Sequence, residues 1–546
     1  MTLPDMHDHA ALEASLQFEV PAHYNFGFDL IDELAKDPDK VAFISVNADA
    51  SEVVPHTFES LRERSNRMAS WLDKLGLERG APAFVMIPRR PAWYEVMIGC
   101  CKSGVVAMPG TNLLTPKDIE YRVHSTEAKV AIVDAAGAER VDEVRQRCPS
   151  LEHFIIVDGE RDGWLSYEQG LTDSSPEYSA SPTSSDDLML IYFTSGTTSM
   201  PKMVPRDHGY AFAHCLTGRY WMDLKANDVH WTLSDTGWAK AAWGMLYGPW
   251  QMGCTQILYD GPPGFDAQFH LELIAKLGVT TFCAPPTIYR LFAQLDLASF
   301  DLSSIRHSIS AGEPLNPEVI KIWKQATGGL VYDGYGQTET VNVVANFPAL
   351  PVRAGSMGKP VPGFEVDVID DDGNACADDE IGHIAIKITD PHPPGLFHGY
   401  WKDEQATAKS FRNGWYYTGD TATRDSDGYF WFVGRSDDII SSAGYRISPF
   451  EVESALLEHP AVAESAVIGK PDKIRGQIVK AFVVLARGNE AGETLAKDIQ
   501  DFVKQHTAPY KYPREIEFTS TLPKTISGKI RRVELRGEGD RSADDT

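Results

Sequence analysis

The stretch from Ile191 to Lys202, IYFTSGTTSMPK, constrains the fold more than any other part of the sequence. Leu188 to Phe193 is an apolar run that predicts a buried strand. Thr194 to Ser199 follows with five hydroxyl side chains and one glycine, and Pro201 and Lys202 stand shortly after them. Backbone N–H groups, hydroxyls and an ammonium in such a loop can bind phosphate. The stretch lacks the Walker A pattern, so taken alone it also fits a polar surface turn.

Strands and helices alternate on both sides of this loop. The predicted elements include strands at Val41–Val46, Pro82–Ile87, Ile305–Ser310 and Gly329–Tyr332, and helices at Phe58–Leu75 and Ala92–Ser103. This order predicts βαβ units and a mainly parallel sheet. Two further polar loops, residues 311–314 and 333–339, follow predicted strands. Since ligands bind at the carboxyl ends of strands in open α/β sheets, the three loops predict a ligand site at one sheet edge.

Other segments predict the domain organisation. Residues 1–25 read as a loosely ordered arm, Asp173–Asp187 as a linker rich in Ser, Pro and Asp, and residues 537–546 as a disordered tail. After about residue 350, short strands with turns at Asp372-Gly373 and Asp427-Gly428 predict a small antiparallel or barrel-like unit. A small α+β domain follows. We therefore predict an N-terminal domain of residues 1–436 and a C-terminal domain of residues 437–546.

Composition excludes several classes of partner. The net charge is −26, whereas nucleic acids and anionic membranes are bound by clustered Lys and Arg. Seven scattered cysteines without a C-x-x-C pair argue against disulfides or a zinc site and predict reduced, buried thiols. The acidic N-terminus shows no signal peptide, and no apolar run approaches the roughly 20 residues of a membrane helix. We expect a cytoplasmic protein without integral membrane contact, and the oligomeric state stays open.

Seven motifs occur in a fixed order: FTSGTTSMPK, SAGEP, DGYGQTET, WYYTGD, GRSDDII, SAGYRISPFEVE and LPKTISGKIRR. Together they resemble the adenylate-forming (ANL) superfamily of acyl-CoA synthetases, peptide-synthetase adenylation domains and luciferases. The resemblance covers about residues 40 to 535 and is strongest to the medium-chain acyl-CoA synthetases of fatty acid metabolism. It implies a large α/β domain with parallel sheets and a β-barrel-like unit, followed by a small mobile α+β domain. It also implies an acid–thiol ligase that uses ATP, Mg²⁺ and coenzyme A.

In such enzymes a carboxylate attacks the α-phosphate of ATP, and CoA then displaces AMP from the acyl-AMP. Lys529 matches the lysine that bridges the acid and the α-phosphate, although it also fits a solvated tail lysine. Glu339 matches the Mg²⁺ ligand, and Thr338 beside it would contact the α-phosphate or the acyl carboxylate. The residues implied to bind ATP are Thr194, Ser195, Gly196, Thr197, Thr198, Ser199, Met200, Pro201, Lys202, Gly312, Glu313, Pro314, Asp333, Gly334, Tyr335, Gly336, Gln337, Asp420 and Arg435. Ser199 departs from the glycine that is usual in the superfamily.

The resemblance also implies sites for CoA and for the acid. Asp437 matches a hinge about which the C-terminal domain rotates between the two half-reactions. Trp238 matches an acyl-pocket aromatic residue. Gly336 stands where acetyl-CoA synthetases carry a tryptophan, so we predict acids larger than acetate. The residues implied to bind CoA are Ala443, Gly444, Tyr445, Arg446, Arg475, Tyr512, Pro513 and Arg514.

Several alternatives remain from the sequence. A medium-chain fatty acid is the first expected substrate, and a branched or aryl acid is the second. The enzyme could also transfer the activated acid to a carrier protein. A non-catalytic AMP-binding or scaffold protein is a third interpretation, which the joint presence of Lys529, Glu339 and Asp420 disfavours.

Overall fold

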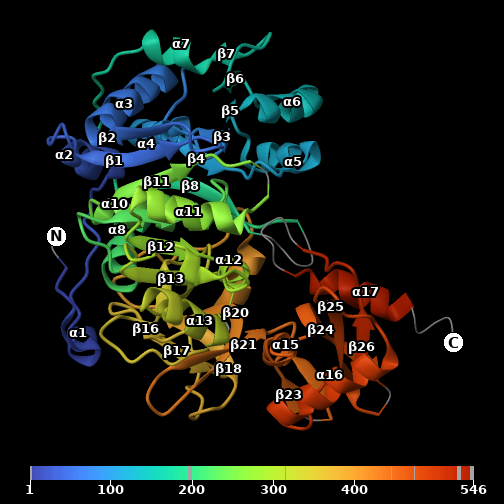
Figure 1. The fold of residues 1–546 in the computed structure, drawn as a ribbon. Helices are drawn as coiled ribbons and strands as arrows, with labels where there is room; N and C mark the ends of the chain where they lie inside the picture. Colours follow the sequence, from blue (N-terminus) through green and yellow to red (C-terminus); the bar gives the residue numbers. More distant parts are fainter. Residues whose placement is uncertain are drawn as a thin grey trace. The chain divides into compact units, whose positions relative to one another are not determined.

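The computed structural model describes residues 3–194, 200–262, 264–313, 315, 317–443, 445–472, 474–524 and 530–541, with side chains to residue 536. The chain forms two compact units (Figure 1). The first comprises residues 1–194, 203–365 and 388–407, and the second comprises residues 195–202, 366–387 and 408–546. The predicted domain boundary after residue 436 lies inside the second unit and stays a prediction.

A seven-stranded sheet forms one layer of the first unit. Its strand order is β7-β6-β5-β3-β4-β8-β9, and every pairing is parallel except that between β8 and β9. The strands are β3 (Pro82–Met86), β4 (Val106–Pro109), β5 (Val130–Val133), β6 (His153–Ile156), β7 (Leu165–Ser166), β8 (Leu188–Phe193) and β9 (Met203–Asp207). The strand predicted at Leu188–Phe193 is confirmed, whereas β9 was not predicted.

A nine-stranded sheet forms a second layer. Its order is β16-β15-β14-β13-β12-β10-β11-β1-β2, with parallel pairings from β14 to β1 and antiparallel pairings at both ends. The strands are β1 (Val41–Val46), β2 (Val53–Thr57), β10 (Val229–Thr232), β11 (Thr255–Tyr259), β12 (Thr281–Ala284), β13 (His307–Ala311), β14 (Val331–Gly336), β15 (Asn342–Ala345) and β16 (Lys359–Pro360). Parallel strands buried on both faces are expected to be largely apolar, which makes them visible in the sequence, although β10 and β13 also bury histidine, threonine and serine side chains.

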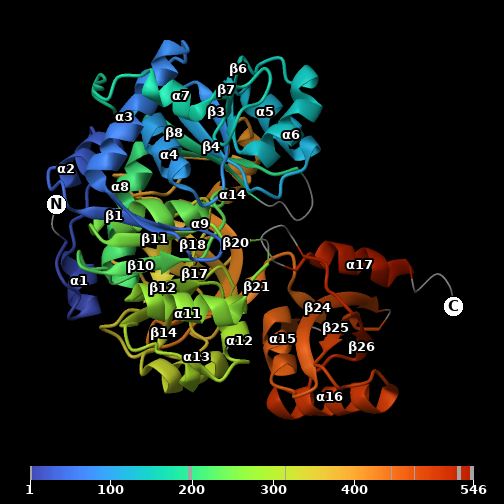
Figure 2. The same ribbon diagram turned by 45° about the horizontal axis from the view of Figure 1, so that its top comes forward.

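Helices cover these sheets. Figure 2 shows α5 and α6 next to each other beside the seven-stranded sheet, and their residues Ile119, Val123, Val141 and Val144 belong to the apolar core of that sheet. The helices are α1 (His9–Ser15), η1 (Phe26–Ile31), α2 (Asp32–Leu34), α3 (Phe58–Lys74), α4 (Pro91–Ser103), α5 (Pro116–Thr126), α6 (Ala135–Val144), η2 (Arg145–Arg147), α7 (Tyr167–Thr172), α8 (His208–Leu216), η3 (Thr217–Trp221), α9 (Ala239–Ala242), η4 (Trp243–Tyr247), α10 (Gly248–Gln251), α11 (Ala267–Leu277), α12 (Pro286–Phe292), η5 (Leu297–Ser299), α13 (Pro317–Thr327) and α14 (Glu404–Ser410).

The N-terminal residues, predicted to form a loosely ordered arm, pack against the predicted linker Asp173–Asp187. Residues 1–25 contain α1 and bury Leu3, His9 and Leu12. The Asp173–Asp187 segment pairs with the end of this arm, because the Tyr24 amide donates to the Thr183 carbonyl at 3.2 Å and Asn25 Nδ2 donates to Thr183 Oγ1 at 3.0 Å. The prediction of a loosely ordered arm was therefore wrong for the described residues, whereas the segment Asp173–Asp187 contains no helix or strand and leads to β8, as expected of a linker.

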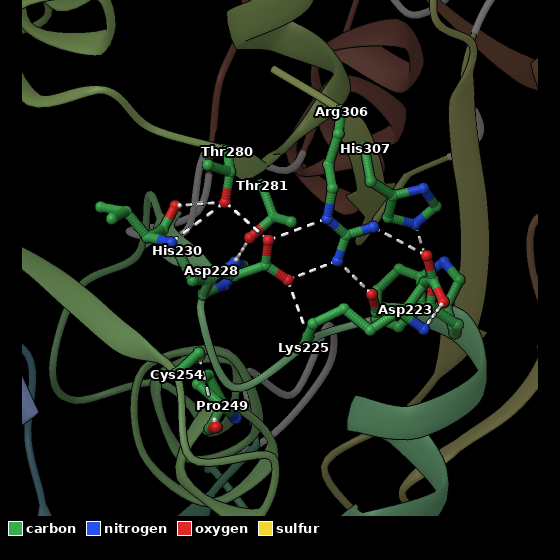
Figure 3. A network of polar contacts seen from close by, with 12 residues as sticks. Asp223, Lys225, Asp228, His230, Pro249, Cys254, Thr280, Thr281, Arg306 and His307 are labelled. Atoms are coloured by element: carbon green, nitrogen blue, oxygen red, sulfur yellow. Dashed lines mark hydrogen bonds and ion pairs between the residues drawn. The ribbon is translucent and has the colours of Figure 1, made fainter. Parts of the chain in front are cut away.

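A polar network closes the nine-stranded sheet at the amino ends of β10, β12 and β13 (Figure 3). Asp228 is buried and accepts from Arg306 Nε at 2.8 Å and from Thr280 Oγ1 at 2.8 Å. The Arg306 guanidinium also donates to Asp223 Oδ2 at 2.8 Å. Burial opposes ionisation of Asp228, but the hydrogen bonds from Arg306 and the Lys225 amide outweigh it and hold the pKa of this carboxyl below its usual value.

We expect Arg306→Met to cost about 2 kcal/mol of unfolding free energy at neutral pH, because it leaves the buried Asp228 carboxylate without its cation. The folded-state pKa of Asp228 lies below the unfolded value, so the pair stabilises the fold above the unfolded pKa and loses this effect as pH falls toward the folded pKa. The difference in unfolding free energy between wild type and Arg306→Met should therefore become smaller below about pH 4. Urea unfolding at a series of pH values measures this difference. Lys36→Met, which removes an exposed pair with Glu33, is the control and should change little. The same difference in unfolding free energy at all pH values would show that the Asp228–Arg306 ion pair is not its cause.

The second unit contains two five-stranded sheets. One is antiparallel and contains β17 (Val366–Ile369), β18 (Gly382–Lys387), β19 (Phe411–Arg412), β20 (Trp415–Arg424) and β21 (Phe430–Arg435). The other contains β22 (Ile440–Ser442), β23 (Tyr445–Ile447), β24 (Val462–Asp472), β25 (Gly476–Leu485) and β26 (Glu515–Phe518), with only β25 and β26 parallel. The predicted small antiparallel unit and α+β unit are both present.

Alternating side chains give the β24–β25 sheet two apolar faces. Val467 and Val483 face α15 (Pro449–Leu457) and α16 (Glu493–His506), whereas Ala466 and Phe482 face Leu535 of α17 (Arg532–Arg541). The tail predicted to be disordered from residue 537 is therefore helical to residue 541, and residues 542–546 lie outside the described part. The packing of Leu535 supports this last helix in spite of its charged sequence.

Candidate active site

The carboxyl ends of the two large sheets meet. Thr236, in the loop after β10, donates from Oγ1 to the Ile87 carbonyl after β3 at 2.6 Å. The next residue, Gly237, lies so close to the loop after β4 that an added Cβ would be 2.0 Å from the Thr111 nitrogen. Arg89 Nε donates to the Tyr259 carbonyl at the end of β11 at 2.8 Å. The sequence predicted that the candidate loops lie at one edge of a single sheet. In the structure these loops follow strands of two different sheets, and the contacts above join the carboxyl ends of those sheets.

A turn after β14 carries the predicted metal ligand. The Gln337 amide donates to Thr340 Oγ1 at 2.9 Å, and this turn presents Thr338 and Glu339. The Glu339 side chain is buried, and its Oε1 accepts from the Tyr400 hydroxyl at 2.9 Å. The loop predicted at 333–339 is therefore shorter, because Asp333 to Gly336 extend β14 and pair with β13 and β15.

Arg206 fixes the same turn from the other sheet. It lies on β9, is almost fully buried, and stacks its guanidinium on Tyr210 at 3.8 Å. Its Nη1 donates to the Glu339 carbonyl at 2.8 Å, and its Nη2 donates to the Gly395 carbonyl. Neither Arg206 nor Tyr400 was predicted from the sequence. An arginine inside an otherwise half-buried strand was the one signal that could have drawn attention to Arg206.

The loop after β13 is tied to β14 by a buried carboxyl group. Asp333 accepts from the backbone of Leu315 and of Gly334, and its burial raises the pKa to about 8. Gly312 has a φ of +110°, which requires glycine, and Glu313 pairs with Arg290 at 3.5 Å. Three predicted ATP-binding residues, Gly312, Glu313 and Asp333, thus lie on neighbouring strand ends, and the interior position of Asp333 suits a positioning role.

The structure gives the two predicted acyl-pocket residues different surroundings. Trp238 is half-buried at the start of α9, beside the loop that joins the sheets. At Gly336 an added Cβ would lie 2.4 Å from the Val341 carbonyl. The backbone that enters β15 passes so close to position 336 that only glycine fits there. This steric reason for the glycine differs from the larger acyl pocket that was inferred from the sequence. Tyr335 is half-buried and its carbonyl accepts from Asn342 Nδ2 at 3.3 Å.

In the second unit, Asp420 and Arg435 are cross-strand partners on β20 and β21. Asp420 is buried, and its Oδ1 lies 3.5 Å from Arg435 Nε, whose side chain is half exposed. The pair has the chemistry predicted for a ribose site: a carboxylate that can accept from two hydroxyls, with a cation beside it. Asp437 follows between β21 and β22, and its carbonyl accepts from Arg536 at 3.3 Å.

The predicted CoA-binding residues divide into two groups. The Ala443 amide donates to the Arg475 carbonyl at 2.8 Å, and the half-exposed Tyr445 stacks on Tyr510 with ring centroids 4.2 Å apart. Arg446 is exposed on β23. By contrast Pro513 is buried, and Tyr512 packs against the apolar core while accepting from Arg514 at 3.1 Å. Pro513 and Tyr512 therefore pack in the interior of this unit. The sequence did not indicate this, because charged residues flank them.

The structure describes only part of the predicted phosphate loop. Thr194 directly follows β8, Met200 is exposed, and Pro201 and Lys202 are half-buried. The predicted residues that the structure does not describe are Ser195, Gly196, Thr197, Thr198, Ser199, Pro314, Gly444 and Lys529.

A cavity of about 450 Å³, which the sequence did not predict, lies at the carboxyl ends of β10, β11 and β12. Most of its lining is apolar, and its one arginine, Arg89, already donates to the Tyr259 and Ser234 carbonyls. The apolar and aromatic lining residues include Trp231, Leu233, Tyr259, Phe265, Pro285 and Ile288.

All seven cysteines are buried free thiols, as predicted. None of the helices in the described ranges combines the length and hydropathy needed to span a bilayer.

Comparison with known proteins identifies the class. Residues 31–401 match the AMP-binding enzyme family, and residues 451–529 match the AMP-binding enzyme C-terminal domain. The chain belongs to the AMP-binding enzyme family. Within that family it groups with the AMP-forming acyl-coenzyme A synthetases: it is 43% identical to acyl-coenzyme A synthetase ACSM3, mitochondrial, of Rattus norvegicus over 97% of this chain and 93% of that protein. The mitochondrial ACSM5 of Homo sapiens is also 43% identical, over 95% of this chain and 91% of that protein.

Solved structures agree with this placement. An anthranilate CoA ligase in complex with anthranoyl-AMP has a TM-score of 0.88 and 32% identity, covering 96% of this chain and 99% of that one. A Brucella canis acyl-CoA synthetase has a TM-score of 0.74 and 35% identity, covering 98% of both chains. The recognition of the superfamily and the fold class predicted from sequence are confirmed.

Proposed function

We propose that this chain condenses a carboxylic acid larger than acetate with ATP, giving an acyl-AMP and pyrophosphate, and then transfers the acyl group to CoA with release of AMP. The buried Glu339 carboxylate carries the proposal. Arg206 and Tyr400 hold it at the turn where the two sheets meet, next to Thr338. Such a fixed group can position a metal–phosphate complex with little reorganisation during the reaction.

Mg²⁺ fits this site. Glu339 presents a hard carboxylate oxygen, and Mg²⁺ is commonly held by one or two carboxylates together with substrate phosphates. When bound, the ion would neutralise phosphate charge that otherwise repels the incoming carboxylate. In the chain itself, Tyr400 orients the carboxylate and Arg206 fixes the backbone that bears it.

Lys529 and the phosphate loop complete the proposal. In the first half-reaction Lys529 bridges the acid and the α-phosphate. The residues from Thr194 to Lys202 bind the β- and γ-phosphates, and Asp420 binds the ribose. Rotation of the C-terminal domain about Asp437 then brings Ala443, Gly444 and Tyr445 to the site for CoA. The exposed Tyr445 and the neighbouring Ala443 and Arg475 support a CoA-binding surface.

A medium-chain fatty acid is the first candidate substrate, since the relatives include ACSM3 and ACSM5. An aryl acid is the second, because the similar structures include an anthranilate CoA ligase and a benzoate CoA ligase from Burkholderia xenovorans. A cytoplasmic location stays our proposal, whereas those two relatives are named as mitochondrial.

A panel of straight, branched and aromatic acids, each supplied with ATP, Mg²⁺ and CoA, tests the function. We expect AMP and the acyl-CoA thioester in equal amounts, with octanoate turned over faster than acetate. Parallel reactions with a phosphopantetheinyl carrier protein in place of CoA should give no product. Faster turnover of acetate, or transfer only to the carrier, would contradict the proposed function.

A further inference from the structure

One lysine beside the candidate acyl site has a buried nitrogen without a hydrogen-bond partner. Lys240 lies in α9, two residues after Trp238, in the segment fixed by the contacts of Thr236 and Gly237 with the other sheet. Its stem is partly exposed, but Nζ is buried and makes no hydrogen bond to any atom of the described residues.

The groups that face this nitrogen do not supply a strong acceptor. Burial lowers the pKa of the Lys240 ammonium, and Cys283 and Glu313 oppose this effect. Burial raises the pKa of the Cys283 thiol, which therefore stays protonated and is only a weak hydrogen-bond partner. Glu313 is already paired with Arg290. Among the described residues, no hydrogen-bond acceptor therefore compensates the cost of burying this ammonium.

Aromatic side chains connect Lys240 to the end of β14. Its Nζ lies 5.8 Å from the centre of the Trp243 ring, and Trp243 packs on Trp221 with centroids 5.2 Å apart. Trp221 in turn covers Gly334, where an added Cβ would lie 2.4 Å from the indole. The ammonium therefore lies next to a pair of tryptophans, Trp243 and Trp221, that packs against β14, the strand that leads to Glu339.

We propose that Lys240 is a specificity-determining residue that donates a hydrogen bond to a second oxygen function, a ketone or carboxylate, on the acid substrate. An unbranched hydrocarbon acid offers no such acceptor and leaves the ammonium unpaired, so the site favours the oxygenated acid of equal length. This inference rests on the proposed function, because it names the class of acid that the site selects.

Two matched acid pairs test the inference: levulinate against valerate, and adipate against hexanoate. The measurement is kcat/KM for pyrophosphate release by wild type and by Lys240→Met, which keeps the length of the stem and removes the donor. Wild type should prefer the oxygenated acid, and the variant should lower that preference about tenfold, the loss expected for one hydrogen bond to a charged group. Lys276→Met in α11, whose Nζ donates to the Ala50 carbonyl, is the control and should keep the wild-type preference.

Two readouts separate this inference from the proposed function. Removing an unpaired buried ammonium should leave the melting temperature of the free protein equal or higher, and calorimetry should show levulinate binding weakened in Lys240→Met while valerate binding is kept. If wild type releases no pyrophosphate with any acid but this binding difference is present, the proposed function fails and the inference stands. The inference is overturned if both proteins show the same preference and the same binding, or if Lys240→Met destabilises the free protein, since Lys240 would then be a structural residue.

Discussion

We expect Glu339→Gln to lower the rate of pyrophosphate release by about a hundredfold or more, because it removes the negative charge that would attract the metal ion. The amide is isosteric with the carboxylate, and its oxygen can still accept from Tyr400, so the turn keeps its geometry. The variant should therefore retain its melting temperature. Higher Mg²⁺ concentrations should recover part of the rate, since the loss is in metal affinity as well as in charge stabilisation.

Glu318→Gln is the matched control for this variant. Glu318 lies in α13 with an exposed side chain beside Lys321, so its neutralisation should change the rate less than twofold, as is usual for exposed pairs. An unchanged rate and unchanged Mg²⁺ dependence in Glu339→Gln would exclude Glu339 as the metal ligand.

Lys529→Ala is expected to separate the two half-reactions. Pyrophosphate release should fall about a hundredfold or more, because the cation that bridges acid and α-phosphate is lost. Thioester formation from preformed acyl-AMP and CoA should persist, because that step does not join two anions at the α-phosphate. Single-turnover assays of each half-reaction measure the two rates separately.

Lys524→Ala controls for the loss of a lysine from the same segment. Lys524 pairs with Glu464 at 2.7 Å on the domain surface, so its removal should leave both half-reactions near wild type. Equal losses of both half-reactions in Lys529→Ala would show that Lys529 supports the domain as a whole rather than the adenylation step.

The parallel strands were predictable because burial on both faces leaves a short apolar run with clear ends. Val41–Val46 and Leu188–Phe193 have the predicted bounds. The antiparallel edge strand β9, Met203–Asp207, was missed because its residues are mixed: it contains a proline, an arginine and an aspartate. Whether a strand joins one sheet or another depends on pairing between distant segments, which local pattern does not encode.

The candidate site was predictable where a motif carries its own chemistry and not where tertiary contact supplies it. Glu339, Asp420 and Arg435 were predicted because they stand in motifs that resemble those of the adenylate-forming superfamily, and the structure shows that Asp420 and Arg435 are cross-strand partners. Tyr400 and Arg206 reach Glu339 from 61 and 133 residues away in sequence, so no local spacing could reveal them. Lys240 was missed because only the folded structure shows that its Nζ atom is buried without a hydrogen-bond partner.

Acid-dependent exchange of labelled pyrophosphate into ATP tests the central claim most directly, because it requires reversible formation of an acyl-AMP and does not involve CoA. We predict exchange that depends on Mg²⁺, rises with octanoate, and is strongly reduced in Glu339→Gln. ATP binding without exchange, across the whole panel of acids, would contradict the claim and would favour a non-catalytic nucleotide-binding protein.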